Sequence, residues 1–313
     1  MIHVLLASAP WWAWLGFHAL VFSLLALDLG VFNRDAHAPS ARESGAWSAV
    51  WIALALGFNG LVLHGMGPAR AGEFLAGYLL EKSLSVDNLF VFVLVFTAFQ
   101  VPRRNQHRVL YWGVLGALVM RAAMILAGTA LLNRFQWMTY VFGGFLVYTG
   151  LRMLMGADDE PGDPRQGRVA RAFQWLVPYD PEGGYGRLFH RHGGRLLATP
   201  MLLVLVVVEV TDLVFAVDSI PAVLAVTRNP FVVYTSNVFA ILGLRSLYFL
   251  LAGMIDRFHH LQTGLAIVLA LVGVKMCLAH LYEVPIGAAL AAIALILAAC
   301  VAASLRWPLA RKD

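Results

Sequence analysis

Cysteine and charge are both scarce in this sequence, and it has no linker of the kind that separates soluble domains. The only two cysteines, Cys277 and Cys300, lie in apolar stretches, which excludes a disulfide framework and a paired-cysteine metal motif. Charged residues make up 13% of the 313 positions, about half of the share usual in soluble domains. Proline and glycine are spread through the apolar runs, so nothing marks a second domain.

Apolar residues dominate instead. They make up 60% of the chain, which is typical of a protein that crosses a membrane several times. The prediction is an all-α membrane protein with about nine transmembrane helices in one domain, residues 1–313, since a span needs about 17 to 25 apolar residues. The apolar segments are 11–32, 47–66, 72–99, 109–132, 135–155, 197–226, 231–254, 259–280 and 285–305.

Basic residues fall mostly on one side of this predicted bundle. The loops after the second, fourth, sixth and eighth segments hold only Arg70, Arg134 and Arg228. Because Lys and Arg are retained in the cytoplasm, the N-terminus is predicted outside, the C-terminus inside and the connection 156–195 in the cytoplasm. The net charge of +5 therefore reflects membrane topology, with a lipid bilayer and no nucleic acid as the partner.

The third segment contains the stretch EKSLSVDNLF (81–90), which places Glu81, Lys82 and Asp87 among apolar neighbours. Each ionisable group at depth costs roughly 2.5 to 3.5 kcal/mol on insertion scales. Such groups therefore need an oppositely charged partner or a functional role. The other cations within predicted helices are Arg121, Arg245 and Lys275.

The sixth segment repeats this pattern in VEVTDLVFAVDSIP (208–221). When Asp218 is aligned with Asp87, Asp212 falls on Glu81. The alignment also matches Ser219 with Asn88 and, further along, Arg245 with Arg121. Chance similarity of two apolar stretches is the alternative, but hydrophobicity alone does not explain a shared acid pair and a shared buried arginine.

The parity of this repeat has a structural consequence. The first copy, about 72–155, and the second, about 197–280, each contain three crossings. An odd number of crossings inserts the second copy upside down, so we expect two inverted three-helix repeats. This is the plan of secondary transporters, which bind substrates where the two copies meet.

Helical spacing separates two kinds of polar position within the motif. At about 100° per residue, Ser85 and Asn88 lie within about 40° of Glu81, whereas Asp87 lies about 120° away. Asp218 is displaced in the same way from the stripe of the sixth segment. Either the two helices unwind before these acids, which Pro221 makes plausible, or the acids face a different neighbour.

The predicted metal site is rich in oxygen. Carboxylate, amide and hydroxyl oxygens are the ligands that Mn²⁺, Ca²⁺ and Mg²⁺ prefer, whereas zinc or copper sites would carry His and Cys. In a structural alternative each acid pairs with a membrane cation. The predicted metal ligands are Glu81, Asp87, Asn88, Glu209, Asp212, Asp218 and Ser219, with Lys82, Arg121 and Arg245 as supporting charge partners and Ser85 and Asn237 as candidate path-lining residues.

The chain resembles the TerC/Alx family of integral membrane proteins, named for tellurium-resistance protein C. The resemblance covers about residues 27–275. It is carried by LDLGVFNRDAH (27–37), EKSLSVDNLFVF (81–92), QHRVLYWGVLGALVMRA (106–122), the long run from GRLLATP to FLLAG (194–253) and DRFHHL (256–261). The connection 156–195 follows the family pattern only loosely.

This resemblance implies membership of the lysine-exporter superfamily of inverted-repeat carriers and a role in metal homeostasis, chiefly Mn²⁺ export and sometimes Ca²⁺ export. The family's intramembrane acids match Glu81, Asp87, Glu209, Asp212 and Asp218 here. We therefore expect a carrier in a bacterial inner membrane, with Mn²⁺ as a substrate, protons as counter-ions and no bound cofactor.

Two other classes of function remain as alternatives to Mn²⁺ export. One is a carrier of Ca²⁺ or another cation, and the other is a membrane scaffold for stress proteins that binds metal without moving it. An enzyme is not expected, because the sequence has no His-Glu-x-x-His helix, no Gly-x-Ser-x-Gly turn and no Ser/His pair at helical spacing.

Overall fold

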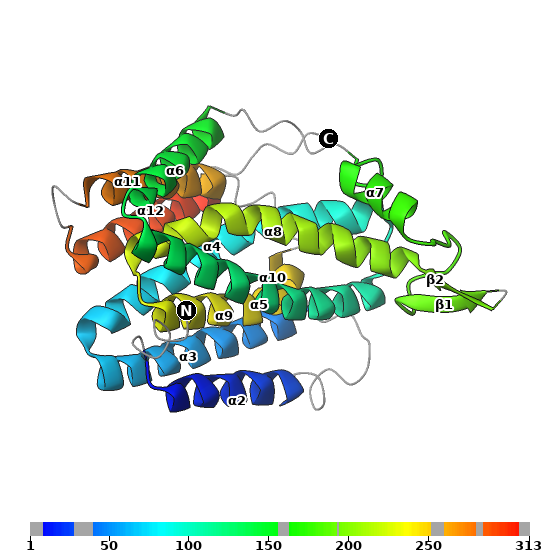
Figure 1. Ribbon diagram of the computed structural model, residues 1–313, viewed down its shortest axis with the longest axis horizontal. Coiled ribbons are helices and arrows are strands. Elements are labelled where there is room, and N and C mark those ends of the chain that lie inside the picture. The colour runs from blue at the N-terminus through cyan, green and yellow to red at the C-terminus, as the bar shows by residue number, and fades with distance from the viewer. Residues whose placement is uncertain are drawn as a thin grey trace.

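The computed structural model describes residues 9–27, 40–155, 163–192, 194–251, 260–279 and 284–306, and most of these are helical. Most of the helices pack together as one bundle (Figure 1). They are α2 (Trp11–Leu27), α3 (Ala41–Met66), α4 (Pro68–Ala98), α5 (Arg103–Arg134), α6 (Met138–Leu154), α8 (Pro200–Val226), α9 (Pro230–Leu242), α10 (Leu244–Leu251), α11 (His260–Leu278) and α12 (Ile286–Arg306).

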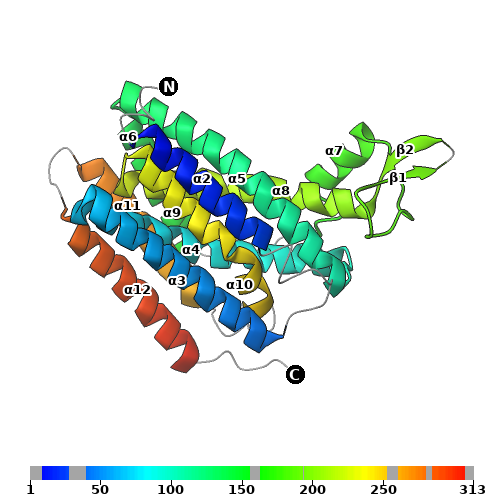
Figure 2. The ribbon, with the colours of Figure 1, turned by 90° about the horizontal axis from the view of Figure 1, so that it is seen from below.

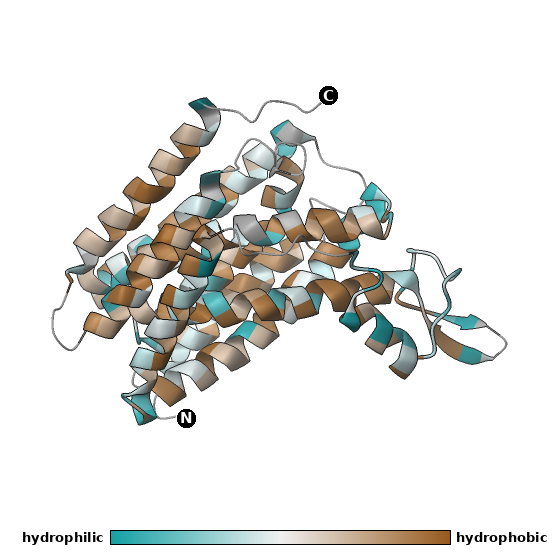
Figure 3. Ribbon diagram, turned by 90° about the horizontal axis from the view of Figure 1, so that it is seen from above, coloured by the Kyte–Doolittle hydropathy of each residue, from teal (hydrophilic) through white to brown (hydrophobic). Residues whose placement is uncertain are grey.

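The prediction of a helical membrane protein is confirmed. Apolar residues run along most of the helices (Figure 3), and many large ones are exposed, such as Val119 and Leu295 with 72% and 70% of their surface. The number of spans and their orientation stay predictions. Within the described residues, the helices long and apolar enough to cross a membrane are Arg42–Met66, Arg103–Arg134, Pro200–Val226, Pro230–Leu250 and Gly287–Ser304, and shorter apolar helices are Trp11–Leu27 and Gln262–Leu278.

Local signals in the sequence explain where several helices begin. Ser40 and Glu43 form a capping box at the start of α3. Pro68 opens α4 directly after Gly67, whose φ of +87° favours glycine. The side chain of Asn229 accepts hydrogen bonds from the first backbone N–H groups of α9.

The contacts between helices follow the order of the predicted repeat. In the predicted repeat α4 corresponds to α8 and α5 corresponds to α9. α5 packs on α8, and α9 packs on α4. The matching helices also meet each other: α4 contacts α8, α5 contacts α9, and α6 contacts α11. Figure 2 shows α3 and α12 outside this six-helix core. Two copies related by a two-fold axis would exchange partners in this way, and the inverted repeat stays a prediction that these contacts favour.

α6 and α11 pack closely against each other along much of their length. A Cβ atom added to Gly150 would lie 2.6 Å from the carbonyl oxygen of Ala266, and one added to Gly273 would lie 2.6 Å from that of Gly143. Small residues at such positions let two backbones touch, as membrane helix interfaces often require. These glycines therefore hold the two helices in backbone contact.

The two helix breaks considered from the sequence do not occur. α4 continues through Asp87, and α8 continues through Asp218 despite Pro221 within it. A proline inside a membrane helix removes one backbone N–H, and the freed carbonyl can find another partner. The break lies instead in the seventh segment, where Gly243 separates α9 from α10.

The connection predicted for 156–195 carries structure of its own, although residues 156–162 and 193 lie outside the described residues. It contains α7 (Arg168–Leu176) and a hairpin of β1 (Phe189–His192) and β2 (Arg195–Ala198), in which Phe189 pairs with Ala198. This hairpin is the one departure from the all-α fold class in the described part of the chain. Figure 1 shows it at one end of the bundle.

Hydrogen bonds attach this connection to the bundle. Arg108 Nη1 of α5 donates to the carbonyl of Gly186 at 2.8 Å, and the hydroxyl of Tyr185 donates to the carbonyl of Phe99 at the end of α4. Burial raises the pKa of Tyr185, so the hydroxyl keeps the proton that it donates. The connection is therefore fixed to the ends of α4 and α5.

Candidate functional site

Arg121 lies at the centre of the bundle, with 2% of its surface exposed. Its Nη2 and Nε donate to the two oxygens of Asp212 at 3.0 and 3.2 Å, the two-bond geometry typical of arginine and a carboxylate. Its Nη1 donates to Glu81 Oε1 and, at 2.9 Å, to Asn237 Oδ1. The Ser219 hydroxyl lies 3.5 Å from the same nitrogen. One arginine of α5 thus contacts predicted site residues on α4, α8 and α9.

Charge does not balance within this cluster. Glu81 and Asp212 bring two negative charges, and Arg121 brings one positive charge. Among the described residues, Glu81 Oε2, Ser85 Oγ and Asn237 Nδ2 are buried without a hydrogen-bond partner. Buried polar atoms nearly always have one. The two oxygens can accept from water or bind a cation, whereas Asn237 Nδ2 only donates and fits water.

The stripe predicted on α4 is buried as the helical spacing requires. Glu81, Ser85 and Asn88 are each almost fully covered and face the neighbouring helices rather than lipid. The side chain of Asp87 lies outside the described residues.

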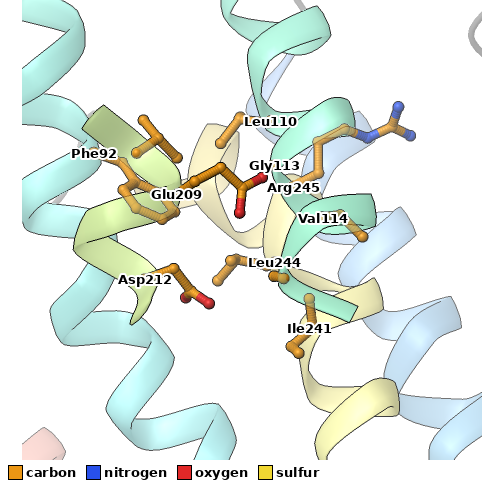
Figure 4. A pocket seen from close by; sticks show the side chains of 11 residues that line it. Phe92, Leu110, Gly113, Val114, Glu209, Asp212, Ile241, Leu244 and Arg245 are labelled. Carbon is orange, nitrogen blue, oxygen red and sulfur yellow. The ribbon is translucent and has the colours of Figure 1, made fainter. Parts of the chain in front are cut away.

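Glu209 lies one helical turn before Asp212 on α8 and lines a narrow pocket between α8, α5 and the α9–α10 break (Figure 4). Its carboxylate rests on the backbone of α5. A Cβ atom added to Gly116 would lie 2.1 Å from Glu209 Oε1, whereas one added to Gly113 would keep ordinary distances. Gly116 therefore provides the space that this carboxylate fills.

Arg245 also lines this pocket, and its guanidinium contacts a different kind of group from that of Arg121. Figure 4 shows its guanidinium directed away from the carboxylates of Glu209 and Asp212. Its Nη1 lies 2.7 Å from His107 Nε2 in the buried part of α5. Since a guanidinium only donates, this contact requires that Nε2 of the histidine accept.

Lys82 contacts the end of α9, and it forms no ion pair with any acid whose side chain the structure describes. Its Nζ donates to the carbonyl of Ala240 at 3.3 Å. Because α9 ends at Leu242, this carbonyl belongs to the last turn, where carbonyls lack partners within the helix and carry partial negative charge. A Cβ atom at Gly243 would lie 2.7 Å from the same Nζ. The ammonium therefore stabilises the end of α9.

Asp218 lies on another face of α8, toward α6. Thr149 Oγ1 of α6 lies 3.5 Å from its Oδ1. Since α8 does not unwind, this arrangement corresponds to the second alternative drawn from the sequence, in which the displaced acid faces a different neighbour.

Comparison with known proteins identifies the group to which the chain belongs. Residues 66–313 match the family described as "Integral membrane protein TerC family". The chain belongs to the TerC family. No solved structure matches it.

Relatives of this TerC protein align over almost their whole length. An "Uncharacterized membrane protein STKORF319" of Myxococcus xanthus is 49% identical over 292 residues, which cover 93% of this chain and 91% of the relative. The "Putative membrane-bound redox modulator Alx" of Escherichia coli (strain K12) is 44% identical over 296 residues, 90% of each chain. An "Uncharacterized membrane protein" of Rickettsia bellii is 34% identical over 273 residues, 87% of this chain and 90% of the relative.

The predicted site acids whose side chains are described lie in three places. Glu81 and Asp212 lie on Arg121, Glu209 lies over Gly116, and Asp218 faces α6. No three His, Cys, Asp or Glu residues in the described ranges lie close enough to hold a metal ion by themselves. The predicted ligand set therefore converges in part, around an arginine.

Sequence reasoning missed one buried acid of this TerC protein. Glu73 leaves 8% of its surface exposed at the start of α4 and binds Arg70 and Thr227. The signal that could have found it is its spacing, because Glu73 precedes Glu81 by eight residues and lies about 80° from it around the helix.

Proposed function

We propose that this TerC protein is a secondary active carrier, and not an enzyme, that exports a divalent metal ion across the bacterial inner membrane in exchange for protons. Mn²⁺ is the favoured cargo, and it is a substrate rather than a bound cofactor. The apolar helices and the membership of a family of integral membrane proteins support a protein that works within a membrane.

The observation that carries the proposal is the buried contact of two acids with one arginine. Glu81 comes from the first predicted copy and Asp212 from the second, and both bind Arg121 at the centre of the bundle. Carriers with inverted repeats bind substrates where their copies meet. The cluster carries excess negative charge, which a cation or a proton would neutralise.

The chemistry of this cluster suits a hard cation. Carboxylate, hydroxyl and amide oxygens surround it, which favours Mn²⁺, Mg²⁺ or Ca²⁺ over zinc and copper. Arg121 supplies positive charge to Glu81 and Asp212 while no metal is bound. Clustered carboxylates in a dry site can exchange a proton for a metal ion, which makes protons the natural counter-ions.

The relatives named as redox modulators suggest a second role, which the cysteines of this chain do not favour. Cys277 lies against Gly143 of α6, and Cys300 lies against Gly264 of α11. Gly264 and Cys277 are thirteen residues apart on α11, about 20 Å along its axis, so the two thiols cannot form one disulfide.

Transport can be tested in inverted membrane vesicles. With an acidic lumen, wild-type vesicles should accumulate Mn²⁺, and Glu81→Gln or Asp212→Asn should reduce the initial rate to the background of empty vesicles. Asp163→Asn, which changes an exposed acid bound to Arg165, is the control and should keep the wild-type rate.

Each other outcome of this assay has a clear meaning. Wild-type flux in both variants would disprove the site, and wild-type vesicles without flux would disprove Mn²⁺ transport. Saturable Mn²⁺ binding without flux would favour the scaffold role. Flux of Ca²⁺ but not Mn²⁺ would favour the calcium carrier.

A further inference from the structure

The buried polar face of α4 extends beyond Glu81 toward the end of the bundle that is predicted to lie outside. At about 100° per residue, Gly77 lies about 40° and Glu73 about 80° from Glu81, both to the same side. Glu73 is buried, and Gly77 lies against Ser236 of α9. Eight residues of helix place Glu73 about 12 Å from Glu81 along the axis. A polar stripe therefore leads from the Arg121 cluster to the start of α4.

Glu73 is covered by a basic side chain at the end of this stripe. Arg70 Nη1, on a side chain that is 41% exposed, donates to Glu73 Oε2 at 2.7 Å. Lys275 of α11 also interacts electrostatically with this acid. The carboxylate is thus buried, while the arginine that binds it reaches the surface.

The same oxygen of Glu73 connects α4 to the turn between α8 and α9. Thr227, the residue after α8, donates its hydroxyl to Glu73 Oε2. The Thr227 hydroxyl in turn accepts from the backbone N–H of Asn229, whose side chain caps α9. One carboxylate therefore fixes the first helix of the first copy to the end of the first helix of the second.

Between the Arg121 cluster and Glu73 the stripe is tightly closed. A Cβ atom added to Gly77 would lie 2.8 Å from Ser236 Oγ of α9, so α4 and α9 touch here. The Ser236 hydroxyl donates to the carbonyl of Val233 in its own helix. The stripe therefore carries a hydroxyl at this point but is closed by the contact between the two helices.

We propose that this stripe is the outward half of the cation path and that Glu73 is its exit acid. The contacts of Glu73 with Arg70 and Thr227, which we call the outer latch, close the path in the conformation described. A divalent cation that leaves the Arg121 cluster binds Glu73 in place of Arg70, and opening parts the α8–α9 turn from α4. This inference rests on the proposed function and adds an exit site to it.

Cysteine labelling tests the latch without any transport. Ser236→Cys, in a background with Cys277→Ala and Cys300→Ala, places one thiol on the closed stripe. A membrane-impermeant methanethiosulfonate applied to intact cells should label it slowly. Adding Glu73→Gln or Arg70→Gln should accelerate labelling by about tenfold, because a charge-assisted contact is lost. Thr227→Val should give a smaller acceleration.

Arg228→Gln is the matched control for Arg70→Gln. Arg228 lies at the same end of the bundle but binds Thr139 of α6 instead of Glu73. Its replacement should leave labelling unchanged. Unchanged labelling in Glu73→Gln, Arg70→Gln and Thr227→Val would overturn the latch, as would equal acceleration by Arg228→Gln.

Mn²⁺ flux and Mn²⁺ binding separate an exit acid from a merely structural one. Glu73→Gln should lower the initial rate in vesicles severalfold while the purified variant binds Mn²⁺ with wild-type affinity. Equal loss of binding and rate, or a wild-type rate, would overturn the exit role. A wild type without flux would disprove the proposed function, and the labelling result would still decide the latch.

Discussion

Arg121 and Arg245 hold matching positions in the predicted repeat, yet they bind different groups. Arg121 lies in an unbroken α5 and contacts Glu81 and Asp212. Arg245 lies just after a helix break and contacts His107. Matching sequence positions therefore do not ensure matching chemistry, because the direction of a side chain depends on whether its helix continues.

The residue two positions before each arginine explains why one helix is broken and the other is not. Gly243 lies two residues before Arg245, and the matching position before Arg121 is Val119. Val119 faces outward from a continuous helix. Gly243 instead packs against Trp51 and the ammonium of Lys82, which occupies the end of α9. Glycine weakens a helix interior, and here the lysine stabilises the broken end.

Replacing the two arginines should give the largest contrast. Arg121→Met leaves two buried acids without their cation and should cost about 3 to 5 kcal/mol of stability, together with all Mn²⁺ flux. Arg245→Met removes a donor from a histidine and should cost about 1.5 to 3 kcal/mol. Thermal unfolding in detergent measures both. Equal losses would show that the two regions are energetically alike.

Filling the helix break should have an intermediate effect. A Cβ atom in Gly243→Ala would lie 3.2 Å from Trp51 Cβ and displace the Lys82 ammonium, so we expect a loss of about 1 to 3 kcal/mol. Gly144→Ala is the control, since nothing lies within 4 Å of that position in α6. The melting temperatures of the two variants provide the measurement, and equal values would refute the role of Gly243.

The smallest effect on stability should come from Gly116→Ala. The added methyl group displaces the flexible carboxylate of Glu209, so stability should change by less than about 1 kcal/mol while Mn²⁺ flux falls severalfold. Gly113→Ala, one turn earlier on α5, has room for its methyl group and should transport normally. Equal flux in the two variants would show that the position of the Glu209 carboxylate does not matter.

The contact of Glu81 and Asp212 with Arg121 has a physical reason that the sequence already contains. A buried charge is costly, so Glu81, Asp212 and Arg121 had to find partners, and they find one another. Asn237 was recognised in the same way as a polar residue inside an apolar helix. The free-energy cost of burying a charge, however, does not determine which group each cation binds. Arg245, for example, contacts His107.

The helix break and the hairpin could not be predicted from local pattern. Pro221 is the stronger local breaker, but α8 tolerates it, whereas α9 ends at Gly243 because Trp51 and Lys82 from other helices pack there. β1 and β2 have no alternating apolar pattern, and the loop before them is attached to α5 through Arg108 and to the end of α4 through Tyr185. Contacts far apart in the sequence decided both features.

The glycine contact between α6 and α11 determines where the two predicted copies can move. Gly143 and Gly150 on one helix and Gly273 on the other bring the backbones together, so separating them would open a gap that no side chain can fill. At the Arg121 cluster, by contrast, the copies are joined by ion pairs, which a cation would replace in the proposed transport. Rocking of one copy against the other would therefore use the α6–α11 contact as its pivot and would have its largest amplitude at the ends of α4 and α8.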